Sequence, residues 1–157
     1  MKWVFRAFAL SILLPIAAGA QNRPTLHRSH ETEYGPNTSS TTNAQMLARI
    51  HTIYLEPIGH DLSRTMAAGL KTLGWVRVVT SRSKADAVLS GTCFDARHLK
   101  IVHSEVYLNN RRSGAAIWED EIRVPYGPPP LAQVVDQSAR ELVAHLQESV
   151  RKARGGR

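Results

Sequence analysis

The sequence predicts an α+β fold, a two-layer sandwich in which two helices cover one face of a mixed five-stranded sheet, in the order βαβββα. Three observations lead to this prediction. An apolar run at residues 84–94 is typical of a central strand, and apolar and polar residues alternate over two later segments. Two other segments each carry a single apolar stripe at helical spacing. A chain of 157 residues has room for one such domain.

The first half of the domain has the pattern of a strand–helix–strand unit. A β-branched and aromatic run over residues 50–55 stops at Pro57 and predicts a strand. Residues 62–73 place four apolar side chains on one helical face, and Gly74 ends the helix. Because a helix of this length forms a right-handed crossover, we expect the strand at residues 76–79 to lie parallel to the first.

Three strands and a long helix make up the second half. The central strand, residues 84–94, contains Gly91, where we expect a bulge or a close approach of two backbones. Residues 101–109 and 115–124 alternate with a period of two, which predicts the rest of an antiparallel meander. A proline-rich turn then precedes a helix with one apolar stripe over residues 131–150. Each helix has a single apolar face, so both should pack on the same side of the sheet.

The amino terminus has the layout of an export signal. Lys2 and Arg6 precede a short apolar run, and Ala18-Gly19-Ala20 is typical of a cleavage site. Gln21, and not a lipid-accepting cysteine, follows that site, so we expect a periplasmic or secreted protein without a lipid anchor. The expected organisation is a signal peptide (1–20), a flexible polar linker (21–45), a single α+β module (46–152) and a basic tail (153–157).

Most of the positive charge lies outside the expected fold. The formal charge of +7 falls to +5 without Lys2 and Arg6, and the last seven residues carry four of those five charges. Nucleic-acid binding needs a basic stripe across a folded face, so we expect no nucleic-acid partner. Contact with a membrane is expected only through the basic tail.

The chemistry-bearing motifs of common enzymes are absent from the sequence. It contains no P-loop, dinucleotide-binding glycine pattern, nucleophile elbow or metalloprotease helix motif. We therefore expect no catalytic residue, no metal and no cofactor. Cys93 is the only cysteine, which excludes an intramolecular disulfide. Its apolar strand favours burial, and pairing between chains is the alternative.

The face of the sheet that the helices leave bare is the candidate binding surface. Alternation along the strands places Tyr54, Phe94, Tyr107 and Ile117 on that face. If these side chains formed one patch, a partner or a second copy of the chain would bind there. A bulge at Gly91 would change the assignment of every later residue.

The order of elements resembles an anticodon-binding-domain-like module of bacterial envelope proteins. The likeness is carried by Ala85-Asp86-Ala87 at the start of a strand that reaches Gly91, and by a later strand from Gly114 to Trp118. It covers about residues 49–152 and is similar to the amino-terminal domain of TolB, the periplasmic core of CsgG and the activator LpoB. The resemblance implies an adaptor that binds other envelope components, and it implies no catalytic residue.

Three functions remain open from the sequence. The preferred one is a non-catalytic binding or adaptor module of the cell envelope that contacts another envelope protein or itself. The second is a metal-dependent hydrolase using Glu119, Glu121 and His103, with Glu105 nearby on the neighbouring strand. The third is a lipid- or lipopolysaccharide-binding protein similar to LptE, which would need a closed apolar pocket between helices and sheet.

Overall fold

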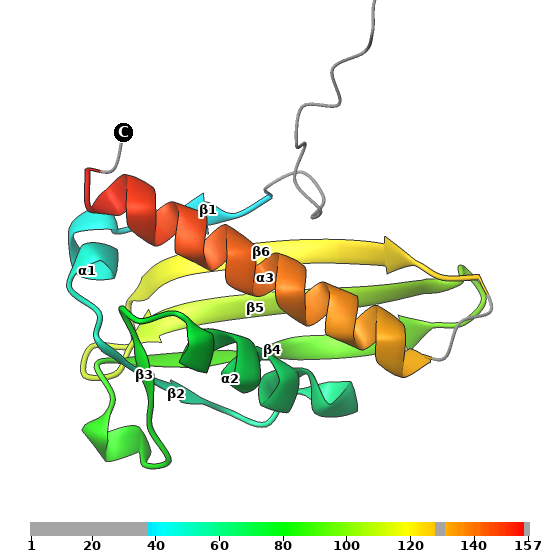
Figure 1. Cartoon of the computed structure of the whole chain (residues 1–157), viewed down its shortest axis with the longest axis horizontal. Helices are drawn as coiled ribbons and strands as arrows, with labels where there is room; N and C mark the ends of the chain where they lie inside the picture. Colours follow the sequence, from blue (N-terminus) through cyan, green and yellow to red (C-terminus); the bar gives the residue numbers. More distant parts are fainter. Residues whose placement is uncertain (1–37, 128–130, 156–157) are drawn as a thin grey trace, which may run out of the picture. The chain divides into compact units, whose positions relative to one another are not determined.

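The computed structural model describes residues 38–127 and 131–155, which form a six-stranded mixed sheet and three α-helices (Figure 1). In chain order the elements are β1 (Ser40–Thr41), α1 (Ala44–Ala48), β2 (Thr52–Leu55), η1 (Gly59–Asp61), α2 (Leu62–Thr72), β3 (Arg77–Val78), η2 (Arg82–Lys84), β4 (Ala87–Ala96), β5 (Ile101–Asn110), β6 (Ala116–Pro125) and α3 (Leu131–Ala153). The α+β class is confirmed. The predicted count of five strands is wrong, because β1 adds a sixth.

The strands lie side by side in the order β1-β6-β5-β4-β2-β3. β2 pairs in parallel with β3, as the crossover through α2 predicts, and on its other side β2 also pairs in parallel with β4. β4, β5 and β6 form the predicted antiparallel meander. The three meander strands have ten residues each, so they provide most of the sheet surface.

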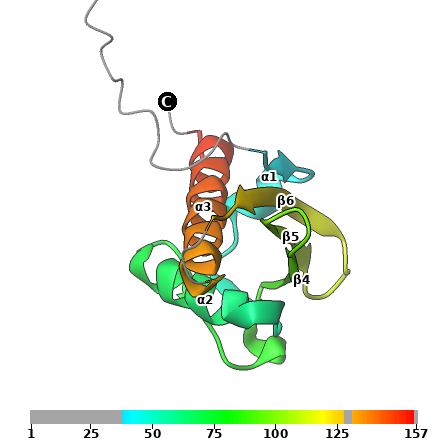
Figure 2. The ribbon, with the colours of Figure 1, turned by 90° about the vertical axis from the view of Figure 1, so that its right-hand side faces the viewer.

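The helices α2 and α3 lie on one side of the meander (Figure 2). The predicted apolar stripe of α3 faces the sheet: Val135, Ala139, Leu142, Leu146 and Val150 are all buried. Trp118 of β6 is fully buried opposite them, and its Nε1–H donates to Ser149 Oγ at 3.0 Å. The other side of the meander carries no helix among the described residues.

The folded domain begins before the predicted boundary at residue 46. Ser40 and Thr41 pair with β6, and Asn43 caps α1 by accepting the Met46 backbone N–H at 2.9 Å. Leu47 anchors this short helix in the core. A strand of two polar residues has no repeating pattern, so the sequence alone does not distinguish it from the linker. The predicted signal peptide and the linker up to residue 37 lie outside the described residues.

None of the helices in the described part of the chain is both long and apolar enough to cross a membrane.

Gly91 is a site of close backbone approach. A Cβ built on it would lie 2.1 Å from the Glu105 carbonyl oxygen, which only glycine avoids. The register of β4 against β5 nevertheless continues from Ala87 to Ala96 without a shift. Cys93 is buried on the helix side of this strand, as predicted, and Ser104 Oγ donates to its Sγ at 3.4 Å.

Candidate functional site

The helix-free face of β4, β5 and β6 exposes two of the four predicted binding residues. Phe94 is 45 % exposed and Tyr107 is 39 % exposed. Tyr54 is on the neighbouring strand β2 and is half-buried. Ile117 is 0 % exposed in the core, so its prediction as a surface residue is wrong.

A β-bulge explains the error at Ile117. Leu108 pairs with Trp118 and the next residue, Asn109, pairs with Ala116, which leaves Ile117 as the extra residue. One extra residue in a strand breaks the alternation between faces. The bulge lies at the β5–β6 turn, whereas Gly91 shows the other expected feature, a close approach of two backbones.

Phe94 and Tyr107 do not form one apolar patch. Phe94 pairs with His103, whereas Tyr107 pairs with Ser90. The pair of Thr92 and Glu105 lies between these two positions. The surface between the aromatic rings is therefore polar and charged.

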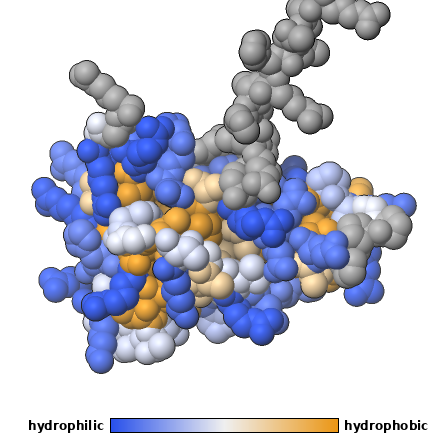
Figure 3. Space-filling model, in the orientation of Figure 1, coloured by the Kyte–Doolittle hydropathy of each residue, from blue (hydrophilic) through white to orange (hydrophobic). Residues whose placement is uncertain are grey.

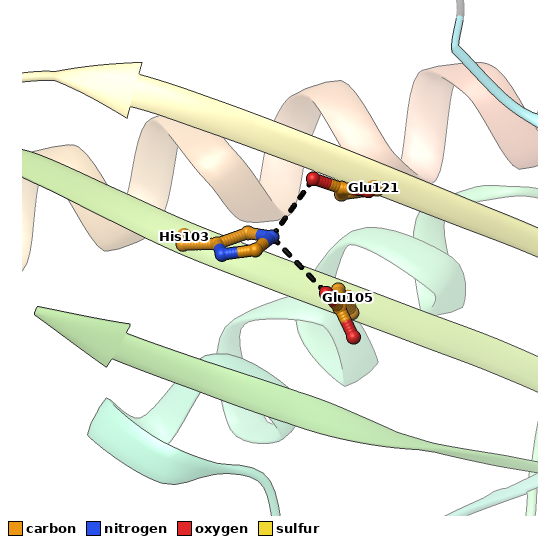
Figure 4. A group of neighbouring side chains, drawn as sticks. All are labelled: His103, Glu105 and Glu121. Carbon is orange, nitrogen blue, oxygen red and sulfur yellow. Dashed lines mark ion pairs between the residues drawn. The ribbon is translucent and has the colours of Figure 1, made fainter. Parts of the chain in front are cut away.

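The centre of this face is a cluster of His103, Glu105 and Glu121 (Figure 4). The β5–β6 register places Glu105 directly opposite Glu121, and His103 lies two residues before Glu105 on the same face. The imidazole Nε2 is 3.2 Å from Glu105 Oε1 and 3.0 Å from Glu121 Oε1. The two carboxylates therefore converge on one ring nitrogen.

Neighbouring side chains hold the cluster in place. The ring of Phe94 meets the imidazole of His103 edge to face, with centroids 4.7 Å apart. The Tyr107 hydroxyl donates to Glu105 Oε2 at 3.1 Å. This hydrogen bond, and then the charge of Glu105, raises the pKa of Tyr107. Arg123 Nη2 lies 2.5 Å from Glu121 Oε1 and neutralises part of the negative charge.

Beside the cluster the surface is hollowed by a polar depression of about 280 Å³. Glu105, Glu119 and Glu121 line it together with Tyr107. Glu119 pairs with Tyr107 and belongs to the next cross-strand pair on the same face, two residues along β6 from Glu121. The structure thus brings together His103 and Glu121 of the predicted hydrolase triad, with Glu105 and not Glu119 as the third group.

Sequence reasoning missed a second polar group, buried between β6 and α3. It consists of Asp120 and His145, whose side chains are both enclosed in the core. Asp120 occupies an inward position of β6, two residues from Trp118, and His145 adjoins the apolar stripe of α3. The sequence signal for this group is Asp120, a charged residue at a position of β6 where the alternation predicts an inward-facing side chain. The side chains of this group are at most 5 % exposed, and their contact ties β6 to α3.

The helix layer carries a surface groove of about 550 Å³ between α2 and α3. Its lining includes Gly69, Leu73, Ala139, Arg140 and Val143, and no residue of the sheet. Figure 3 looks onto this helix layer, where polar side chains alternate with patches of apolar surface. The groove is therefore different from the closed pocket between helices and sheet that a lipid carrier requires.

Comparison with known proteins shows the fold. No protein-family model matches the chain, and no curated protein matches its sequence. The solved PelC dodecamer from Paraburkholderia phytofirmans superposes with a TM-score of 0.53 at 18 % identity, over 70 % of this chain and 96 % of that one. TolB from Acinetobacter baumannii superposes with a TM-score of 0.52 at 10 % identity, over 73 % of this chain and 31 % of TolB. The expected resemblance to a TolB domain is thus confirmed for the fold.

Proposed function

We propose that this chain is a non-catalytic binding module of the bacterial cell envelope that assembles with copies of itself through its helix-free sheet face. The observation that carries the proposal is the open face of three long strands, where the exposed rings of Phe94 and Tyr107 stand on either side of a polar and charged centre. A solvated sheet face is ordinarily polar, whereas exposed aromatic side chains are enriched at protein interfaces.

Charge complementarity supports a second copy as the partner. The sheet face carries the three carboxylates of Glu105, Glu119 and Glu121. The end of the domain that carries the last turn of α3, the β5–β6 turn and η2 has the opposite charge (Figure 1). We call it the basic end and define it by Lys84, Arg112, Arg151, Lys152 and Arg154. All five side chains are exposed, and Glu148 pairs with Arg151 and Lys152.

Hydrogen bonds join the parts of the basic end. Arg154 donates to the carbonyls of Ala48 and Ile50, which ties the last turn of α3 to the start of β2. The backbone N–H of Arg111 donates to the Asp86 carbonyl, which ties the β5–β6 turn to the start of β4. The basic tail predicted over residues 153–157 is therefore part of a folded surface as far as Arg154.

A basic end that meets the acidic sheet face of the next copy makes a head-to-tail contact. Such heterologous contacts generate rings when the rotation closes. The fold likeness to a protein solved as a dodecamer supports assembly of this kind. The fold shared with PelC and TolB and the predicted export signal together support a location in the bacterial envelope.

The test is the mass of the purified chain in solution, measured by sedimentation velocity over a concentration series with EDTA present. We expect species heavier than a monomer, and a lower association constant for Phe94→Ser. Leu99→Ser is the matched control, because Leu99 is an exposed apolar side chain on the β4–β5 turn. A strictly monomeric mass at every concentration would overturn the proposal.

A charge exchange tests the proposed geometry. Glu119→Lys should weaken association by repulsion from the basic end, and Arg112→Glu should do the same from the other side. The double variant should recover part of the affinity, because the two exchanged charges again attract each other. Additive losses in the double variant would contradict a contact between these two regions.

A further inference from the structure

We propose that His103, Glu105 and Glu121 form a binding site for one divalent transition-metal cation, with Zn²⁺ as the best match. The site lies on the helix-free face and shares Glu105 and Glu121 with the surface proposed above for self-assembly, but its test measures zinc binding and not association.

The backbone register places two negative charges side by side. Glu105 and Glu121 are a directly opposed cross-strand pair, and like charges in that position destabilise a sheet. Both carboxylates belong to rigid strands of ten residues, so the backbone holds them together. A cation between the two side chains would turn this repulsion into attraction.

The distances suit metal coordination. One ligand atom from each of the three residues lies within 4.8 Å of the other two. Nε2 of His103 is already 3.2 Å from Glu105 Oε1 and 3.0 Å from Glu121 Oε1. Ligand atoms about 3.3 Å apart are what a tetrahedral zinc site with bonds of about 2.0–2.1 Å requires. Small rotations of the two glutamate side chains would complete the site.

The imidazole nitrogen is oriented for a cation and not for a hydrogen bond. Nε2 of His103 is shielded from solvent and makes no hydrogen bond of acceptable geometry, although both oxygens are within ion-pair distance. The two contacts diverge to either side of the ring nitrogen in Figure 4. A neutral imidazole with its proton on Nδ1 would direct the Nε2 lone pair between the carboxylates, where a metal ion belongs.

The surrounding groups favour zinc and also limit its affinity. Tyr107 binds Oε2 of Glu105 and leaves Oε1 directed at the site, as an outer-shell partner does. One imidazole with two carboxylates suits Zn²⁺, whereas Mg²⁺ and Ca²⁺ prefer oxygen ligands alone. Arg123 pairs with Glu121 and competes with the cation for that carboxylate. The remaining coordination positions would be filled by water from the open face.

The test is calorimetric titration of the full chain with Zn²⁺ alone. His27 and His30 stand near Glu31 and Glu33 in the sequence, so they are replaced by alanine in every sample to remove a competing site. We expect one Zn²⁺ per chain in this background. His103→Ala and Glu121→Gln should each weaken binding by at least about tenfold, and Arg123→Gln should strengthen it.

His98→Ala is the matched control, because His98 is an exposed histidine on the β4–β5 turn. The zinc affinity of His98→Ala should equal that of the chain in which only His27 and His30 are replaced. Circular dichroism checks that each variant is folded. If His103→Ala does not fold, the zinc affinity of Glu121→Gln, a change on an exposed side chain, still tests the proposal. The proposal is overturned if zinc binding is not saturable, or if a folded His103→Ala or Glu121→Gln variant binds as tightly as the background.

Discussion

The carboxylate of Asp120 meets the imidazole of His145 inside the core, with Oδ2 of the aspartate 2.6 Å from Nδ1 of the histidine. The two side chains are 0 % and 5 % exposed. Thr38 Oγ1 donates to the other oxygen of Asp120 at 2.6 Å. One carboxylate therefore joins β6, α3 and the segment before β1, which are far apart in the sequence.

Removing the Asp120 carboxylate should destabilise the domain strongly. Asp120→Ala removes the carboxylate that His145 contacts in the core, and the loss of one member of a buried pair costs about 3 kcal/mol. Urea denaturation followed by circular dichroism measures the free energy of unfolding. Glu119→Ala, on the exposed neighbour, should change it by less than about 0.5 kcal/mol. Equal stabilities for the two variants would show that the pair contributes nothing.

A methyl group at Gly91 should be poorly tolerated. The new Cβ would collide with the Glu105 carbonyl, a backbone atom that can move only if β4 and β5 separate. We expect Gly91→Ala to lower the free energy of unfolding by about 3 kcal/mol. Gly74→Ala is the control, because a Cβ at Gly74 would have no atom within 4 Å. Similar melting temperatures for both variants would argue against the close approach.

Asp86 should make stability depend on acid pH. Burial opposes its ionisation, but hydrogen bonds from the backbone of His51 and from Thr52 outweigh burial, so the pKa of Asp86 is below its ordinary value. A lowered pKa stabilises the fold above the unfolded-state pKa, and this contribution is lost as the pH falls through the folded pKa, below about pH 4.

Asp86→Asn should therefore cost on the order of 1 kcal/mol at pH 7 and less at pH 3. Urea denaturation at the two pH values gives the comparison. Asp136→Asn, at an exposed position of α3, is the control and should show a smaller difference. A deficit of the same size at both pH values would show that ionised Asp86 is not the source.

The thiol of Cys93 should be unreactive in the folded protein. It is buried against Ser104, and burial raises the pKa of the Cys93 thiol, although the hydrogen bond from Ser104 partly offsets this. Because the thiolate is the reactive form, labelling with an aromatic disulfide reagent should be slow in buffer and fast in urea. Rapid labelling of the native chain, or a disulfide-linked dimer on a non-reducing gel, would contradict burial.

The regular elements of the fold follow from local patterns. The apolar stripe of α3, the alternation along β5 and β6 and the crossover through α2 are each readable within one segment. The resemblance to a TolB domain has the same basis, and the superposition agrees with it. The short elements β1 and α1 could not be recognised, because two residues make a single strand period and five residues make little more than one helical turn, so no pattern repeats.

The sequence by itself determined which segments become helices and strands, because burial of one apolar face imposes a period on each of them. Only the tertiary structure decided which side chains meet. A single bulge near Asn109 moved Ile117 into the core, and the pairing of β5 with β6 set Glu105 opposite Glu121. Such contacts depend on the register between two strands. The order of apolar and polar residues in one strand does not define its register against another.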